Sequence, residues 1–204
     1  MTNSNTYNGR FVMSAEWDTQ SGIQLTWPHQ ATDWQPMLSE ITDTYVKMAV
    51  EIAKREQLII VAPQPEEALR AIAEKTGNDI TENIITMKCD TDDTWARDHG
   101  FITLCGNNGS RILLDFRFNG WGMKFKADKD NAINRKLYDA GIVKGEYKDN
   151  LDFVLEGGSI ESDGRGTVFT TTGCLMAPNR NQPMSQDEIE SELKRRLKAD
   201  CIVW

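Results

Sequence analysis

The order of its predicted strands and helices constrains this chain most, because one β-β-α-β pattern occurs twice. In residues 101–156, "FITLC" and "RILLDF" flank the polar turn "GNNGS", which predicts a hairpin, and the helical "KDNAINRKLYDAG" and the strand "FVLE" follow. Residues 158–204 repeat this order with "SIES", "TVFTTT", a helix and "CIVW", and residues 22–63 are a looser version. Repeats of this size usually stack around an axis. The sequence therefore predicts an α/β fold of repeated units.

Local signals place the remaining elements. "GIQLTW", "LIIVAP" and "NIITMKC" predict strands, and the apolar spacing in residues 35–57 predicts a helix, with a shorter helix over 66–75. Ser185 and Glu188 fit a capping box at the start of the last helix. Because the sequence stops at Trp204 inside an apolar strand, we expect a truncated array: one incomplete domain over 1–204, with 1–14 as a flexible segment.

Composition excludes several function classes. The net charge of −8 argues against a broad surface for nucleic acid or anionic membrane. The N-terminus lacks a signal-peptide core and no apolar run is long enough to span a bilayer, so a soluble cytoplasmic protein is expected. The four cysteines show no C-x-x-C spacing, and neither a P-loop nor a dinucleotide fingerprint occurs. We therefore expect no metal and no cofactor.

The stretch "DTDDTWARDHG" combines an aromatic residue, Trp95, with a carboxylate three residues later, Asp98. A carboxylate can accept two parallel hydrogen bonds from a guanidinium, and an indole can stack on the same planar cation. The spacing therefore fits a guanidinium clamp. The alternative is that Asp98 pairs with Arg97 or with a helix N-terminus while Trp95 fills the core.

Glu156 ends an apolar strand directly before Gly157 and Gly158, where the backbone can approach a ligand closely. Burial there would raise the pKa of its carboxyl toward the range useful for acid–base chemistry. The alternative is an ordinary surface turn after a strand.

Two further loops carry candidate residues. "RFNGWGMKF" sets Trp121 between two glycines, which suits either a lid over a site or a plain turn. "WPHQATDW" offers Asp33 after a strand. Cys174 could meet His99 in space as a nucleophile pair, although free cysteines are more often structural.

Several segments resemble, in order, successive motifs of the agmatine deiminase family. They are "AEWDTQSGIQLTWPHQATDW", "DDTWARDHG", "RFNGWGMKF", "LEGGSIESDGRGTVFTT" and "CLMAPNRN", covering residues 15–204. The family is similar to bacterial peptidylarginine deiminases within the guanidine-modifying (pentein) superfamily. The resemblance implies a pentein-type α/β propeller of five ββαβ blades, of which this chain supplies about three.

The resemblance also implies a reaction, the hydrolysis of agmatine to N-carbamoylputrescine and ammonia in putrescine synthesis. A cysteine thiolate attacks the guanidinium carbon, a histidine protonates the departing ammonia, and the thiouronium intermediate is hydrolysed without a metal or organic cofactor. By motif position, Asp98 resembles the carboxylate that grips the guanidinium, Trp95 the wall beside it, and Glu156 the second acidic residue. The other substrate-binding positions implied are Asn119, Trp121, Gly122 and, for the distal amine, Asp33.

The family's catalytic histidine and nucleophilic cysteine lie in motifs beyond Trp204, so we expect this chain alone to be inactive. Cys174 belongs to "CLMAPNRN", which is not the nucleophile motif. A peptidylarginine deiminase and a non-catalytic guanidine-binding module remain alternatives. The expected partner is a small cationic guanidine rather than nucleic acid or membrane, and a homo-oligomer is left open.

Overall fold

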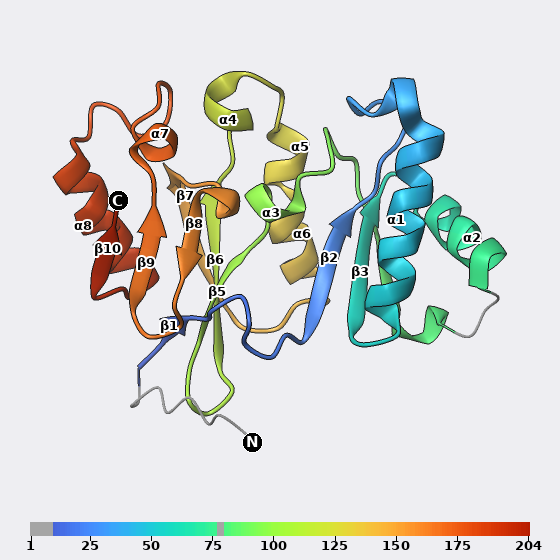
Figure 1. Ribbon diagram of the computed structural model, residues 1–204, viewed down its shortest axis with the longest axis horizontal. Coiled ribbons are helices and arrows are strands. Elements are labelled where there is room, and N and C mark those ends of the chain that lie inside the picture. The colour runs from blue at the N-terminus through green and yellow to red at the C-terminus, as the bar shows by residue number, and fades with distance from the viewer. Residues whose placement is uncertain (1–9, 77–79) are drawn as a thin grey trace. The chain divides into compact units, whose positions relative to one another are not determined.

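The computed structural model describes residues 10–76 and 80–204 (Figure 1). The chain divides into two compact units, each with its own sheets and core. The first unit contains the described residues 10–18 together with Arg97–Phe125 and Val143–Trp204, and the second contains Thr19–Ala96 and Lys126–Ile142.

The second unit is built on a parallel three-stranded sheet in the order β2-β3-β4. Its strands are β2 (Gly22–Thr26), β3 (Gln57–Ala62) and β4 (Ile84–Lys88), as the apolar runs predict. Parallel neighbours need a crossover connection, and the helices α1 (Leu38–Ala53) and α2 (Pro65–Thr76) provide both crossovers (Figure 1).

The core of this unit explains why β3 reads as an unbroken apolar run. Leu58, Ile60 and Val61 are fully buried in this central strand. Helix α1 contributes Ala49 and Ala53, also fully buried, to the same core. The predicted helix over 35–57 is too long, because the structure has a 3-10 turn η1 (Gln35–Met37) before α1 and the helix ends at Ala53.

Three short elements complete the second unit: the 3-10 turn η2 (Thr81–Asn83) and the helices α5 (Asp128–Asn131) and α6 (Ile133–Asp139). The predicted helix over 129–141 is thus two helices that meet at Ala132, where the N–H bonds to the Lys129 carbonyl in a tighter i→i−3 pattern.

The first unit holds a four-stranded sheet in the order β1-β5-β6-β7. The predicted hairpin is confirmed as β5 (Ile102–Cys105) antiparallel to β6 (Arg111–Arg117), and β7 (Glu146–Val154) runs parallel to β6. The strand expected at 153–156 therefore begins earlier and ends before Glu156. The prediction of a flexible segment over 1–14 is wrong for Val12 and Met13, because these residues form strand β1 (Val12–Met13), which pairs with β5. Residues 1–9 lie outside the described residues.

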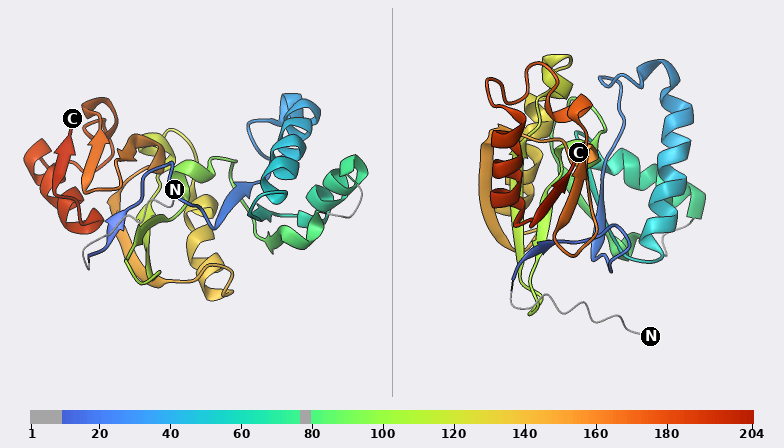
Figure 2. Two further views of the ribbon diagram at one scale, coloured as in Figure 1. Left: turned by 60° about the horizontal axis from the view of Figure 1, so that its bottom comes forward. Right: turned by 60° about the vertical axis from the view of Figure 1, so that its left-hand side comes forward.

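A second sheet of the first unit has the order β10-β9-β8. Its strands β8 (Ile160–Ser162) and β9 (Thr167–Thr170) are antiparallel, and β10 (Cys201–Val203) runs parallel to β9. Helices α7 (Thr172–Leu175) and α8 (Gln186–Leu197) connect β9 to β10, and α8 runs beside these strands (Figure 2). Its Ile189, Leu193 and Leu197 belong to the same buried cluster as Val168 and Ile202 of the sheet. Its predicted capping box at Ser185 is confirmed. The order of elements in both predicted β-β-α-β units is thus confirmed.

Four short elements follow strands in the chain: α3 (Ala96–His99), α4 (Gly120–Met123), η3 (Gly157–Ser159) and α7 (Thr172–Leu175). Candidate site residues lie in these elements or directly before them, with Asp98 in α3, Trp121 in α4 and Glu156 before η3. No helix among residues 10–76 and 80–204 has the length and apolar character needed to cross a membrane.

Candidate functional site

Asp98 lies on α3, and two donors from distant parts of the first unit hold its carboxylate. The backbone N–H of Gly158 donates to Oδ1 at 3.0 Å, and the indole N–H of Trp121 donates to Oδ2 at 3.2 Å. Burial raises the pKa of Asp98, while these two hydrogen bonds work in the opposite direction. Of the alternative pairings, the one with Arg97 is wrong, since Arg97 forms its salt bridge with Glu161 at 3.0 Å. The one with a helix N-terminus is confirmed in part, because the Gly158 N–H belongs to the 3-10 turn η3.

The two glycines after Glu156 allow α3 to approach η3 closely. A Cβ at Gly158 would collide with Oδ1 of Asp98, and a Cβ at Gly157 would collide with the backbone carbonyl of Arg97. The close approach predicted at these glycines therefore involves the chain's own carboxylate.

The loop that carries Trp121 makes a left-handed turn. Gly120, Trp121, Gly122 and Met123 have φ values of 64°, 56°, 85° and 65°. Glycine adopts this conformation freely, but each other residue loses about 1–2 kcal/mol in it. Asn119 stabilises the turn, because its Oδ1 accepts the N–H of Gly122 at 2.9 Å. The turn directs the Trp121 indole onto the carboxylate described above.

Aromatic rings enclose Trp121 on two sides. Phe118 meets the indole edge-on with a centroid distance of 5.3 Å, and Phe125 does so at 5.6 Å. Such edge-to-face pairs fix ring orientation as well as burying area. The indole is thus held in one direction by packing and by its hydrogen bond.

Glu156 is buried, with 3% of the residue exposed, so the alternative of a surface turn is wrong. Its Oε1 lies 2.9 Å from Nε of Arg180, whose side chain is only 7% exposed. Burial raises the pKa of Glu156, the positive charge of Arg180 lowers it, and the nearby negative charge of Asp98 raises it again. The first unit therefore brings two predicted acids, Asp98 and Glu156, within electrostatic range.

Trp95 and Asp33 belong to the second unit. The Trp95 indole donates to Oδ2 of Asp93 at 3.0 Å and lies tilted on Trp34, with ring centroids 6.3 Å apart. Trp95 is 41% exposed and is therefore not a core residue. Burial raises the pKa of Asp93, and the negative charge of Asp33 raises it further, against the Trp95 hydrogen bond.

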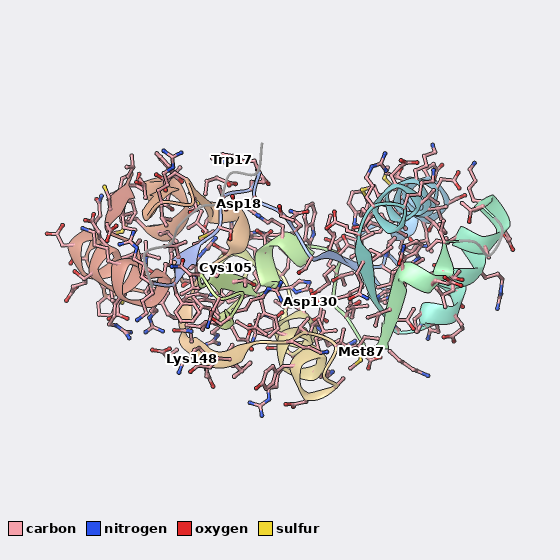
Figure 3. The ribbon with its side chains drawn as sticks, turned by 90° about the horizontal axis from the view of Figure 1, so that it is seen from below. Trp17, Asp18, Met87, Cys105, Asp130 and Lys148 are labelled. Atoms are coloured by element: carbon pink, nitrogen blue, oxygen red, sulfur yellow. The ribbon has the colours of Figure 1, made fainter. Side chains whose placement is uncertain are left out.

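Asp130, labelled in Figure 3, lies on α5. It supports the same acidic loop and was not predicted from the sequence. It is 1% exposed, and its carboxylate accepts the backbone N–H groups of Asp92 at 2.7 Å and Asp93 at 3.0 Å. Burial, together with the neighbouring negative charges, raises its pKa to about 7. An aspartate in the first turn of a helix resembles a solvated acid in sequence, so no local signal marks this role.

The structure gives no support to a nucleophile pair of Cys174 and His99, which the sequence had left open. His99 is 2% exposed and packs against Phe118, and burial lowers its pKa to about 4, which makes it a weak base near neutral pH. Cys174 lies in α7, and its N–H donates to Thr171. Among the residues that the structure describes, no three His, Cys, Asp or Glu side chains are grouped to hold a metal ion.

Residues 12–204 match the sequence model of the Porphyromonas-type peptidyl-arginine deiminase family. The chain belongs to this family. Among curated relatives, a putative agmatine deiminase of Selenomonas ruminantium is 34% identical over 95% of this chain, and an agmatine deiminase of Stutzerimonas stutzeri is 33% identical over 95%. The chain spans 53% and 52% of their lengths, about half of each.

Solved structures of the family have the same fold. A putative arginine deiminase from Porphyromonas gingivalis is 39% identical, with a TM-score of 0.86 over 95% of this chain and 56% of its own. A cysteine-to-serine variant of C. jejuni agmatine deiminase with substrate bound is 35% identical, with a TM-score of 0.85 over 96% of this chain and 56% of its own. The mixed α/β fold is therefore of the agmatine deiminase and peptidyl-arginine deiminase type, and the predicted resemblance is confirmed.

Proposed function

We propose that this chain supplies the guanidinium-binding part of a guanidine hydrolase whose substrate is agmatine. The observation that carries the proposal is the carboxylate of Asp98, partly buried and fixed by Gly158 and Trp121 beside the buried Glu156. Two carboxylates in a desolvated setting attract a planar cation strongly and can hold it in one orientation. Two of the relatives named above, from Stutzerimonas stutzeri and C. jejuni, are agmatine deiminases.

Each predicted residue then has a distinct role. Asp98 grips the guanidinium nitrogens, Glu156 is the second acidic contact, and the turn containing Asn119, Trp121 and Gly122 shapes the pocket. Binding of a cation favours the ionised carboxylates, whose pKa values burial raises in the free protein. For Trp95 and Asp33, the roles of aromatic wall and contact to the distal amine stay predictions from the family motifs.

The chemistry proposed is that of the family. A cysteine thiolate attacks the guanidinium carbon, ammonia leaves after protonation by a histidine, and water releases N-carbamoylputrescine from the thiouronium intermediate. The motifs for that histidine and cysteine are expected in the half of the relatives that this chain does not match. We further propose a propeller of ββαβ blades, about three of five within residues 1–204, forming one incomplete domain.

Calorimetric titration of the purified 204-residue chain with agmatine tests the proposal. Saturable binding that Asp98→Asn abolishes, and that the exposed control Asp187→Asn preserves, is the expected result. No binding at millimolar agmatine would contradict it. Ammonia release at enzyme-like rates would contradict the assignment of the catalytic groups to the unmatched half.

A peptidyl-arginine substrate is the second candidate, because the matching family model carries that description. No arginine of this chain is assigned to hold an α-carboxylate, which favours agmatine over free arginine. This does not separate agmatine from a peptidyl arginine, whose α-carboxyl is part of a peptide bond. Competition between agmatine and a short peptide with an internal arginine separates the two. Preference for the peptide would overturn the choice of agmatine.

A non-catalytic guanidine-binding module would also bind agmatine without turnover. The intact mass of the native gene product in its source cells decides between them. A mass well above 23.1 kDa supports the hydrolase, whereas a mass matching the 204 residues favours the binding module.

A further inference from the structure

The segment Asn179–Asn181, which follows α7, contacts the candidate site at three points although none of its residues was predicted to act there. Asn179 binds the left-handed turn: its Nδ2 donates to the Gly122 carbonyl at 3.2 Å, and its own carbonyl accepts from Nδ2 of Asn119 at 2.7 Å. The turn that presents an indole to Asp98 is thus held from both ends.

Asn181 binds the end of β7. Its Oδ1 accepts the N–H of Val154 at 2.9 Å, and its Nδ2 donates to the carbonyl of the same residue at 2.9 Å. The side-chain amide therefore supplies both hydrogen bonds that a neighbouring strand would make. This contact fixes the backbone two residues before Glu156.

Arg180 lies between these two anchors and reaches Glu156. Their ion pair is 2.9 Å from Nε to Oε1, with side chains 7% and 4% exposed. The N–H is not aligned with the oxygen, so the contact is one of charge more than of hydrogen bonding. The guanidinium passes so close to Gly122 that a Cβ there would collide with it. One arginine thus joins the turn to the acid.

We propose that Arg180 is a positioning residue that fixes Glu156 and keeps it ionised for a guanidinium ligand, with Asn179 and Asn181 anchoring it. This inference deepens the proposed function and rests on it. Asp98 and Glu156 repel each other when both are charged, and the cation of Arg180 reduces that repulsion. The three groups together carry a net charge of −1 when ionised, which one guanidinium neutralises. The ion pair uses Oε1, and an ionised carboxylate retains acceptor sites for a second cation.

The first test measures the titration of the Glu156 carboxyl in the absence of any ligand. Carbon-13 NMR of the side-chain carboxyl gives its titration midpoint in the wild type, Arg180→Gln, Arg180→Lys and the exposed control Arg165→Gln. We expect Arg180→Gln to raise the midpoint, because no positive charge then offsets the burial of Glu156. In Arg180→Lys and in Arg165→Gln the midpoint should stay below that of Arg180→Gln. An unchanged midpoint in Arg180→Gln would overturn the proposal.

The second test measures agmatine affinity against pH in the same variants. Arg180→Gln should bind about tenfold more weakly near neutral pH, in line with the loss of a contact to a charged group, and should recover at higher pH as Glu156 ionises. A loss that pH does not restore would overturn the positioning role. If the wild type binds no agmatine while the midpoint still shifts, the proposed function fails and the ion-pair role stands.

A third variant covers the case in which Arg180→Gln does not fold. The double variant Glu156→Gln with Arg180→Gln removes the buried lone charge and should restore the dispersed amide spectrum of the wild type. Persistent unfolding of the double variant would show that Arg180 serves the fold independently of Glu156, which overturns the inference.

Discussion

The indole N–H of Trp121 lies 3.2 Å from Oδ2 of Asp98, although the two residues are in separate short elements of the first unit. A left-handed turn sets this contact, and Gly158 holds the other carboxylate oxygen. The aromatic residue that touches this acid is therefore the one in the glycine-rich turn. Trp95 instead donates to Asp93.

Replacing Trp121 by Phe removes the donor and keeps the ring. We expect the pKa of Asp98 to rise, because a hydrogen bond to its charged form is lost, and the free energy of unfolding to fall by about 1–3 kcal/mol. Carboxyl NMR titration and denaturant unfolding measure both. Trp95→Phe is the control, since its donor serves Asp93. Equal effects of the two variants on Asp98 would contradict the prediction.

Replacing Gly158 by Ala places a Cβ against Oδ1 of Asp98. We expect unfolding free energy to fall by about 1–3 kcal/mol through overpacking, and agmatine binding to weaken because the carboxylate must move. Gly173→Ala is the matched control, because its Cβ would meet only Oγ1 of Thr171 at 3.9 Å. Calorimetry measures agmatine affinity and chemical denaturation measures the unfolding free energy of both variants. An unchanged agmatine affinity in Gly158→Ala would count against a fixed position of the Asp98 carboxylate.

Asp130 makes stability depend on pH. Its folded-state pKa of about 7 lies above the ordinary value of 3.8, so the folded protein holds a proton that the unfolded chain releases. Stability from this group is present below pH 3.8 and is lost as pH rises to about 7, at about 1.4 kcal/mol per pKa unit.

We therefore expect Asp130→Asn to flatten the fall in unfolding free energy between about pH 4 and pH 7. Urea denaturation at several pH values measures this slope. Asp128→Asn, an exposed neighbour on the same helix, should keep the wild-type slope. If both variants keep it, Asp130 does not titrate in this range.

Met123 is 75% exposed and has a φ of 65°. Met123→Gly should relieve the left-handed strain at little loss of burial, so stability should rise by up to about 1 kcal/mol. Lys124→Gly, at a right-handed residue with φ −77°, should instead lower it by about 1 kcal/mol. Thermal unfolding of both variants measures this difference. A loss of stability in both variants would argue that Met123 is not strained.

Local patterns predicted the parts of the fold that depend on neighbours in sequence. The polar turn before Arg111 marked a hairpin, and Ser185 with Glu188 marked a helix start, because turns and caps are made by adjacent residues. The first seven residues of β7, "EYKDNLD", were not predicted as a strand, because their polar side chains do not alternate with apolar ones. That segment forms a strand because it pairs with β6.

Within the candidate site, sequence reasoning named Asp98, Trp121 and Glu156 as candidates, but it predicted neither the hydrogen bond of Trp121 to Asp98 nor the ion pair of Glu156. The ion pair of Glu156 with Arg180 joins residues far apart in the chain, and no local spacing signals such a contact. Asp130 was missed for the same reason, since only the folded loop shows which N–H groups its carboxylate receives. Long-range polar contacts are set by tertiary structure.

The two units are interleaved along the chain, and this fixes the order in which a ribosome can complete them. Every part of the second unit has been made once Ile142 is added, whereas the first unit still lacks β7 and everything after it. Glu156 is then synthesised before Arg180, and at about 5–20 residues per second the delay lasts on the order of seconds. During that interval the acid cannot form the ion pair that it makes in the folded structure. The nascent chain must keep Glu156 hydrated or protonated until the arginine emerges.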